Sequence, residues 1–214
     1  PGAYFRGGIV FYLFQEGDPG YVAREIHGLI AATEDLGGES GCSWGCYEYK
    51  ESDSNKSIEV SGADGHKLGT GEQNTKDIIL AGCNKDLIQK NNRNWQLWLR
   101  SSKLKYSLDE TYPGNSFAAK LCADYKVKEG RKTYNDWFLP SKTELIILYN
   151  RRHKVSRFGK KHFWLPPGLL MTHARTYWSS TKQDDDAYSM SFHSGEIRST
   201  WRHEYNYVRP IRAF

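Results

Sequence analysis

The sequence predicts an α+β fold, with helices in the middle of the chain and an antiparallel sheet towards its C-terminal end. Apolar residues at helical spacing follow N-cap signals in the central part, whereas the last third alternates between apolar and polar residues around a glycine turn. Because the two patterns occupy separate parts of the chain, they are typical of α+β proteins. The length of 214 residues fits one domain, so we expect a single domain over residues 1–214.

Two short apolar segments predict strands near the N-terminus. Residues 8–14 (GIVFYLF) and 27–32 (HGLIAA) are rich in β-branched, aromatic and aliphatic side chains. Residues 33–73 are dense in Gly, Ser, Glu and Asp and predict a long loop. Asn74 and Thr75 then predict the start of a helix that runs as far as Cys83.

Two further helices and a series of strands are predicted after residue 114. Asn115 and Ser116 are N-cap candidates for a helix over 117–125. Ser141 and Glu144 form a capping box, which predicts a third helix through Tyr149. Alternation predicts strands, with a turn at Ser194-Gly195, over residues 177–180, 187–192, 197–201 and 207–212.

The charge balance favours anionic partners. The formal net charge is +5 and the pI is about 8.9, which is a moderate excess that names no particular partner. No helix-turn-helix, RNA-recognition or zinc-finger pattern is found, so we expect no nucleic-acid partner. No stretch approaches 18 consecutive apolar residues, so we expect no membrane insertion.

The even number of cysteines predicts a disulfide framework formed in an oxidising compartment. We expect Cys83 to bond Cys122, which would join two helices, and Cys42 to bond Cys46, which would close a tight loop. The other two pairings of four cysteines stay open, as do free buried thiols. Zinc is disfavoured because three residues separate Cys42 from Cys46 and no histidine lies near them.

A basic run after the third predicted helix is the sharpest candidate binding site. It contains six cations and no acid: Arg151, Arg152, Lys154, Arg157, Lys160 and Lys161. The arrangement of residues 151–154 is typical of heparin-binding patches. Sulphates repeat along a glycan, and arginine binds a sulphate through two parallel N–H bonds. The alternative is a solvated basic loop whose cations suit the C-terminal end of a helix.

Catalytic and metal motifs are not found in the sequence. It holds no Gly-x-Ser-x-Gly, His-Glu-x-x-His or P-loop pattern, and its seven histidines are scattered. We therefore expect no enzyme activity, no cofactor and no metal site. Asp184-Asp185-Asp186 lacks the spacing of a calcium loop and predicts a polar turn. A second basic set over residues 85–105 surrounds Trp95 and Trp98, and an amphipathic element with buried tryptophans is the favoured interpretation.

Seven segments, in the same order along the chain, resemble the family of the C-terminal domain of the Legionella collagen-like protein. These segments are residues 7–11, 27–32, 69–75, 118–125, 136–145 (from DWFLPS to Glu144-Leu145), 177–181 (YWSST) and 208–214 (VRPIRAF). The resemblance implies a C-type-lectin-like fold in the C-terminal head of a longer, collagen-like chain. It also implies a homotrimeric adhesin, secreted or on the bacterial surface in association with the outer membrane, with a role in biofilms.

The ligands implied by the resemblance are sulphated glycosaminoglycans, heparin-like or chondroitin sulphate-like. The sequence departs from true C-type lectins because it has no Glu-Pro-Asn or Gln-Pro-Asp motif, so we do not expect calcium-mediated sugar binding. Two alternatives remain open: an enzyme acting on glycans on the same fold, and a structural trimer cap without a ligand.

Overall fold

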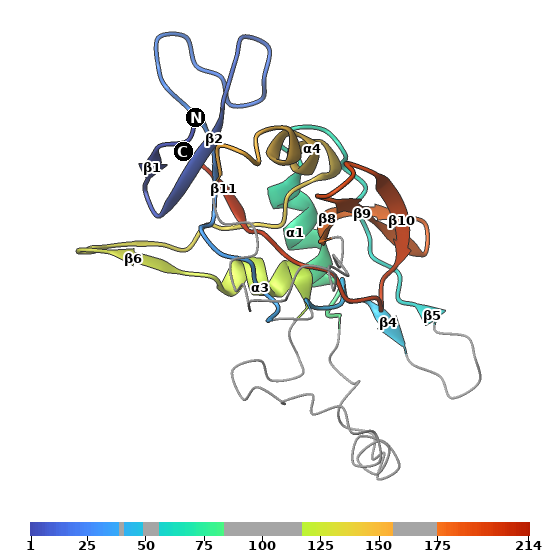
Figure 1. The fold of residues 1–214 in the computed structure, drawn as a ribbon. Helices are drawn as coiled ribbons and strands as arrows, with labels where there is room; N and C mark the ends of the chain where they lie inside the picture. Colours follow the sequence, from blue (N-terminus) through green and yellow to red (C-terminus); the bar gives the residue numbers. More distant parts are fainter. Residues whose placement is uncertain (39–40, 49–55, 84–116, 156–174) are drawn as a thin grey trace, which may run out of the picture.

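The computed structural model describes residues 1–214 except for 39–40, 49–55, 84–116 and 156–174 (Figure 1). Every strand pair within its sheets is antiparallel. Together with the helices described below, this gives the mixed α+β fold that the sequence predicts. In the described part of the chain, no helix combines the length and the apolar character needed to cross a membrane.

The first sheet joins the two ends of the chain. Its order is β1 (Tyr4–Phe5), β2 (Gly8–Leu13), β3 (Gly28–Ala31) and β11 (Ile211–Ala213). The predicted strands at 8–14 and 27–32 are therefore confirmed. All four residues of β3 are buried, and a Cβ at Gly28 would overlap the backbone of β2. The N- and C-termini consequently lie close together (Figure 1).

The second sheet is formed by the predicted strands of the last third. Its order is β10 (Ile197–Trp201), β9 (Asp186–Ser191) and β8 (Thr176–Gln183). The prediction of one strand over residues 207–212 is wrong. Tyr207 still pairs with β8, but the chain then leaves this sheet, and β11 pairs with β3. Pro210, between these two pairings, has no N–H to donate to a ladder.

Two small hairpins were not predicted. One pairs β4 (Tyr47–Glu48) with β5 (Lys56–Ser57), and the other pairs β6 (Val127–Glu129) with β7 (Lys132–Tyr134). The β6–β7 hairpin projects from the body of the molecule at the left of Figure 1. Their strands of two or three residues are too short for an alternating pattern to show in the sequence.

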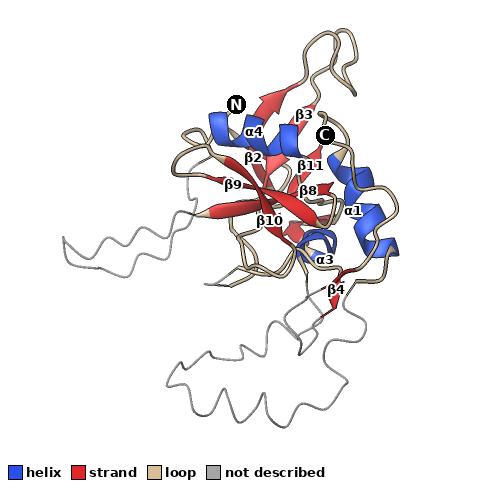
Figure 2. Cartoon of the chain, turned by 90° about the vertical axis from the view of Figure 1, so that its right-hand side faces the viewer, coloured by secondary structure: helices blue, strands red, loops and turns tan. Residues whose placement is uncertain are grey.

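The helices of the described chain are α1 (Gly71–Leu80), α3 (Ala118–Asp124) and α4 (Lys142–Asn150). The capping box at the start of α4 is confirmed, with Ser141 as N-cap and Glu144 at the third helical position. Figure 2 shows the three helices arranged around β8, β9 and β10. Because α4 packs against β2 as well as β8 and β9, it connects the two sheets.

The starts of α1 and α3 differ from the prediction. Helix α1 begins at Gly71, so Asn74 lies inside the helix and is not its N-cap. The Asn74 side chain is buried and bonds the backbone of Gly65. Helix α3 has Phe117 rather than Asn115 or Ser116 as its N-cap residue.

Two buried tryptophans fix the centre of the core. Trp44 and Trp178 are fully buried, and each donates its indole N–H to a backbone carbonyl, of Ser179 and Cys42 respectively, at 2.8 Å. Because a buried indole N–H must find an acceptor, these bonds hold the segment at 42–44 against β8. The core thus joins residues that are far apart in the chain.

Candidate polyanion-binding surface

The buried carboxylate of Glu144 joins the segment before α1 to the start of α4. Its Oε1 accepts from the Gly69 N–H at 2.8 Å, and its Oε2 accepts from the Ser141 N–H at 2.7 Å. The Gly71 N–H also faces this carboxylate. Burial raises the pKa of Glu144, and the surrounding N–H groups oppose that rise. The buried Glu144 carboxylate therefore has a structural role and is not part of the binding surface.

The two arginines of the C-terminal VRPIRAF segment are buried in ion pairs. Arg209 is fully buried and bonds Asp35 through Nε at 2.7 Å, while its Nη1 donates to the Ala32 carbonyl at 2.8 Å. Arg212 binds Asp136 through two parallel bonds of 2.6 Å. Both guanidinium groups are therefore occupied within the protein and contribute little to its exposed charge.

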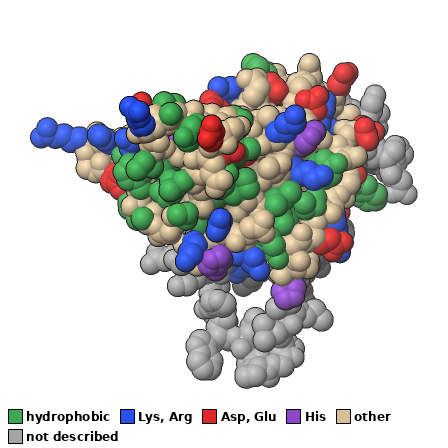
Figure 3. Space-filling model, turned by 90° about the horizontal axis from the view of Figure 1, so that it is seen from above, with side chains coloured by type: hydrophobic (Ala, Val, Ile, Leu, Met, Phe, Trp, Pro, Cys, Tyr) green, Lys and Arg blue, Asp and Glu red, His purple; other side chains and the backbone are tan. Residues whose placement is uncertain are grey.

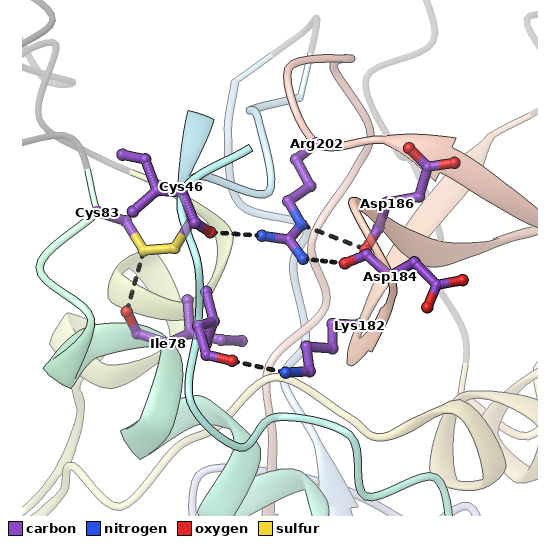
Figure 4. The surroundings of a disulfide bond; sticks show 9 residues. Cys46, Ile78, Cys83, Lys182, Asp184, Asp186 and Arg202 are labelled. Atoms are coloured by element: carbon purple, nitrogen blue, oxygen red, sulfur yellow. Dashed lines mark hydrogen bonds between the residues drawn. A yellow bond between two sulfur atoms is a disulfide. The ribbon is translucent and has the colours of Figure 1, made fainter. Parts of the chain in front are cut away.

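The predicted disulfide pairing is wrong. Cys46 bonds Cys83, with Cα atoms 4.3 Å apart, whereas Cys42 and Cys122 are free and buried. Backbone pairing separates Cys42 from Cys46: both the N–H and the carbonyl of Cys42 bond Asn206, while the Cys46 carbonyl accepts from Ile58. The bond connects the 42–46 segment with the residues that follow α1 (Figure 4).

Cations near this disulfide bind backbone carbonyls (Figure 4). Arg202, which is 3% exposed, donates to the carbonyls of Ile58, Asp184 and Asp186, and burial lowers its pKa. Lys182 donates to the Val60 carbonyl at 2.6 Å. These bonds attach the segment at 58–60 to the second sheet.

Asp184 and Asp185 form the turn between β8 and β9, and Asp186 is the first residue of β9. Asp184 adopts a positive φ of 47°, and the Asp186 carboxylate accepts from Ser199 in β10 at 2.8 Å. Within the described ranges, no group of three or more His, Cys, Asp and Glu side chains is placed to hold a metal ion.

The structure places three of the six predicted binding residues at the C-terminal end of α4. Arg151 and Lys154 are exposed. Arg152 is half-buried, donates to the Tyr149 carbonyl at 3.0 Å and lies over the Tyr149 ring at 3.9 Å. It therefore stabilises the helix end, as the alternative interpretation of this run supposes. Arg157, Lys160 and Lys161 lie outside the described residues.

A second basic surface, which the sequence analysis missed, lies on the β6–β7 hairpin. We call it the basic hairpin, and its exposed cations are Lys126, Lys128, Arg131 and Lys132. None of these four makes a salt bridge with a residue that the structure describes. Figure 3 shows Lys and Arg side chains at the projecting left end of the molecule, where the hairpin lies in Figure 1.

The two faces of the hairpin carry different side chains. Lys126 and Lys128 share one face because side chains alternate along the chain. The opposite face carries Val127 and Tyr134, which lie next to Gly7 in the β1–β2 turn, and the directly opposed residues Glu129 and Lys132. Gly130 forms the hairpin turn with a positive φ of 60°. The Lys-x-Lys spacing before Gly130 is the signal by which the sequence could have indicated this surface.

An exposed group of aromatic rings lies elsewhere, next to β4 and β10. The His203 ring lies 5.4 Å from the Trp201 ring and 5.7 Å from the Tyr47 ring, measured between centroids. Trp201 and Tyr205 are each 63% exposed. These rings add an apolar surface that is separate in sequence from the basic hairpin.

Comparison with known proteins addresses the family. No match is found among curated proteins. The family model described as the Lcl C-terminal domain matches residues 79–212, a range that includes the basic hairpin, α4 and the whole second sheet. Since this match covers more than half of the chain, the resemblance seen in the sequence is confirmed: the chain belongs to the Lcl C-terminal domain family, which suggests a domain of a collagen-like surface protein.

Proposed function

We propose that this domain is an extracellular adhesin module that binds sulphated glycosaminoglycans, heparin-like or chondroitin sulphate-like, through its exposed cations. The observation that carries the proposal is the basic hairpin, whose four exposed cations make no salt bridge with a described residue, although Lys132 lies opposite Glu129 in the ladder. Arg151 and Lys154 at the end of α4 add two more exposed cations.

The hairpin suits a repeating polyanion. Lys126 and Lys128 lie about 7 Å apart along one face of the strand, and their flexible ammonium groups adapt to sulphates at varied spacing. Exposed cations also keep their bound anions hydrated, so association avoids the desolvation that a buried ion pair requires. Binding of this kind is driven by the release of condensed counterions and weakens as salt rises.

The proposal extends to the setting of the domain. We place it at the bacterial cell surface, outer-membrane associated or secreted, as the trimeric head of a collagen-like chain with a role in biofilms. Membership of the Lcl C-terminal domain family supports this setting. The pairing of the last strand with the N-terminal sheet is compatible with the C-type-lectin-like fold that we propose for the family.

The test is the salt dependence of heparin-fragment binding to a Lys126→Gln/Lys128→Gln variant. If both lysines contact the polyanion, the slope of log K against log salt decreases by about 1.4–1.8, by analogy with nucleic acids. The association constant scales as the salt concentration raised to minus this slope. A slope that is smaller by about 1.4–1.8 therefore corresponds to an affinity at 0.15 M salt that is about 10- to 30-fold lower.

An Arg24→Gln/Lys67→Gln variant is the matched control, because it removes the same charge from two exposed cations that, like those of the hairpin, make no salt bridge with a described residue. Its slope is expected to stay that of the parent protein. An Arg151→Gln/Lys154→Gln variant measures the contribution of the α4 end to binding, and it spares Arg152, whose side chain bonds the Tyr149 carbonyl in the last turn of the helix. Equal losses in the hairpin and control variants would show that net charge alone attracts the glycan and would overturn the site.

A further inference from the structure

Two cysteines remain after the Cys46–Cys83 bond is accounted for, and both lie in the same core. Cys42 is 7% exposed and Cys122 is fully buried, and the two belong to one hydrophobic cluster with Trp44 and Trp178. Burial raises the pKa of the Cys42 thiol to about 12. At neutral pH these thiols are therefore protonated and chemically protected in the folded protein.

A backbone hydrogen bond joins the segment that contains Cys42 to the helix that contains Cys122. The carbonyl of Ser43, the residue after Cys42, accepts from the Ala118 N–H at 3.0 Å at the start of α3. Cys122 lies one turn further along that helix, about 6 Å along its axis, on the same buried face as Ala118. Burial raises the pKa of the Cys122 thiol, and a negative charge on Cys42 raises it further, which is an effect of neighbouring groups.

We propose that Cys42 and Cys122 form a second disulfide in the oxidised protein. Each thiol loses one proton, and the pair passes two electrons to a disulfide oxidant such as glutathione disulfide, which is reduced to two thiols. This bond would enclose the Cys46–Cys83 bond in sequence. The short 42–46 segment would then be linked covalently to α3 at one end and to the residues after α1 at the other.

Burial also determines when the bond forms. The attacking species in thiol–disulfide exchange is the thiolate, which is scarce at a buried thiol whose pKa is about 12. We therefore place formation of the Cys42–Cys122 bond during folding, while both thiols are still exposed to the oxidant. A chain folded under reducing conditions should keep both thiols and oxidise slowly afterwards.

The direct test needs no mutation. The reduced, unfolded chain is refolded in a buffer of reduced and oxidised glutathione, then unfolded in iodoacetamide and digested without reduction by chymotrypsin, which cleaves after Trp44 and so separates Cys42 from Cys46. The expected result is a Cys42–Cys122 cross-linked peptide beside the Cys46–Cys83 peptide, with no alkylated cysteine. Folded protein with carbamidomethylated Cys42 and Cys122, at every glutathione ratio that forms the Cys46–Cys83 bond, would overturn the proposal, as would an exchange of partners.

A second measurement separates the bond from packing at the same site. A Cys42→Ala/Cys122→Ala variant keeps the Cys46–Cys83 bond, so reducing agent affects only that bond. In the oxidised parent protein, reduction removes both bonds, and the fall in Tm should exceed that of the variant by about 5–10 °C. An equal fall in the two proteins would show that Cys42 and Cys122 are not linked.

Discussion

Replacing Glu144 by glutamine tests how the fold is held together at the start of α4. The two carboxylate oxygens accept backbone N–H groups from Gly69 and Ser141, and Gly71 faces the same group. An amide has only one oxygen, so its NH₂ must face at least one of these donors. Near pH 4 the raised pKa keeps Glu144 mostly protonated, and the hydroxyl oxygen of the acid can still accept a hydrogen bond, whereas the amide nitrogen of glutamine cannot. One buried N–H without an acceptor costs about 1–3 kcal/mol, which is the expected loss of unfolding free energy at this pH.

The pH dependence of that loss follows from the raised pKa of Glu144. A carboxyl group whose pKa is higher in the folded than in the unfolded state stabilises the protein fully below the unfolded pKa. That contribution is lost as pH rises through the folded pKa. The amide of the Glu144→Gln variant does not titrate, so the stability difference between parent and variant should shrink as pH rises from about 4 towards 7.5.

Urea denaturation at a series of pH values measures this difference directly. The conservative control is Glu72→Gln, an exposed position in the first turn of α1, where the change in stability is expected to stay within about 0.5 kcal/mol. A Glu144→Gln penalty that grows with pH would refute the reasoning. It would mean that the N–H groups outweigh burial and that the folded state binds this proton more weakly than the unfolded chain.

Two further predictions concern charged groups. Asp35→Asn removes the carboxylate that pairs with the fully buried Arg209, and it is expected to lower the unfolding free energy by about 3–5 kcal/mol in urea denaturation. The control is Glu196→Gln, which removes one partner of an exposed ion pair and should change stability little. Equal effects of the two substitutions would contradict a stabilising role for the buried pair. Chelation with EDTA should leave heparin-fragment binding unchanged in a titration, because the exposed lysines meet the anion directly. Loss of binding would instead indicate a metal-bridged site, with residues 184–186 the first to test.

Elements that depend on local sequence could be predicted, and those that depend on distant partners could not. The capping box of Ser141 and Glu144 acts within one helical turn, and it occurs as predicted. The first sheet, by contrast, requires β11 to pair with β3, and an alternating pattern does not name the strand beside it. Asn74 has the residue type of an N-cap, but its side chain bonds the backbone of Gly65, nine residues earlier, and does not cap a helix. Helix α1 instead starts at Gly71, three residues before Asn74.

The cysteine pairing failed for the same reason. Cys42 and Cys46 are neighbours in the sequence, but Asn206 and Ile58 hold their backbones in different places. The basic hairpin was missed because its strands are short and its lysines alternate with other residues, whereas the run at 151–161 is dense. The density of cations along the sequence thus indicated the run at 151–161 and did not indicate the basic hairpin.

The net positive charge is the composition argument for an anionic partner, and our proposal assigns that role to different residues from those that the sequence suggested first. Much of the arginine charge in the C-terminal part is used inside the protein: Arg202 binds three carbonyls, Arg209 pairs with Asp35, and Arg212 pairs with Asp136. A guanidinium group tolerates burial when its fork of donors is fully bonded, whereas an ammonium group favours water. The exposed positive charge therefore rests on other cations, and in the described chain four of them, Lys126, Lys128, Arg131 and Lys132, lie together on the projecting basic hairpin. Removing lysines from that hairpin should consequently weaken glycan binding and leave folding intact, whereas removing the buried arginines should destabilise the fold itself.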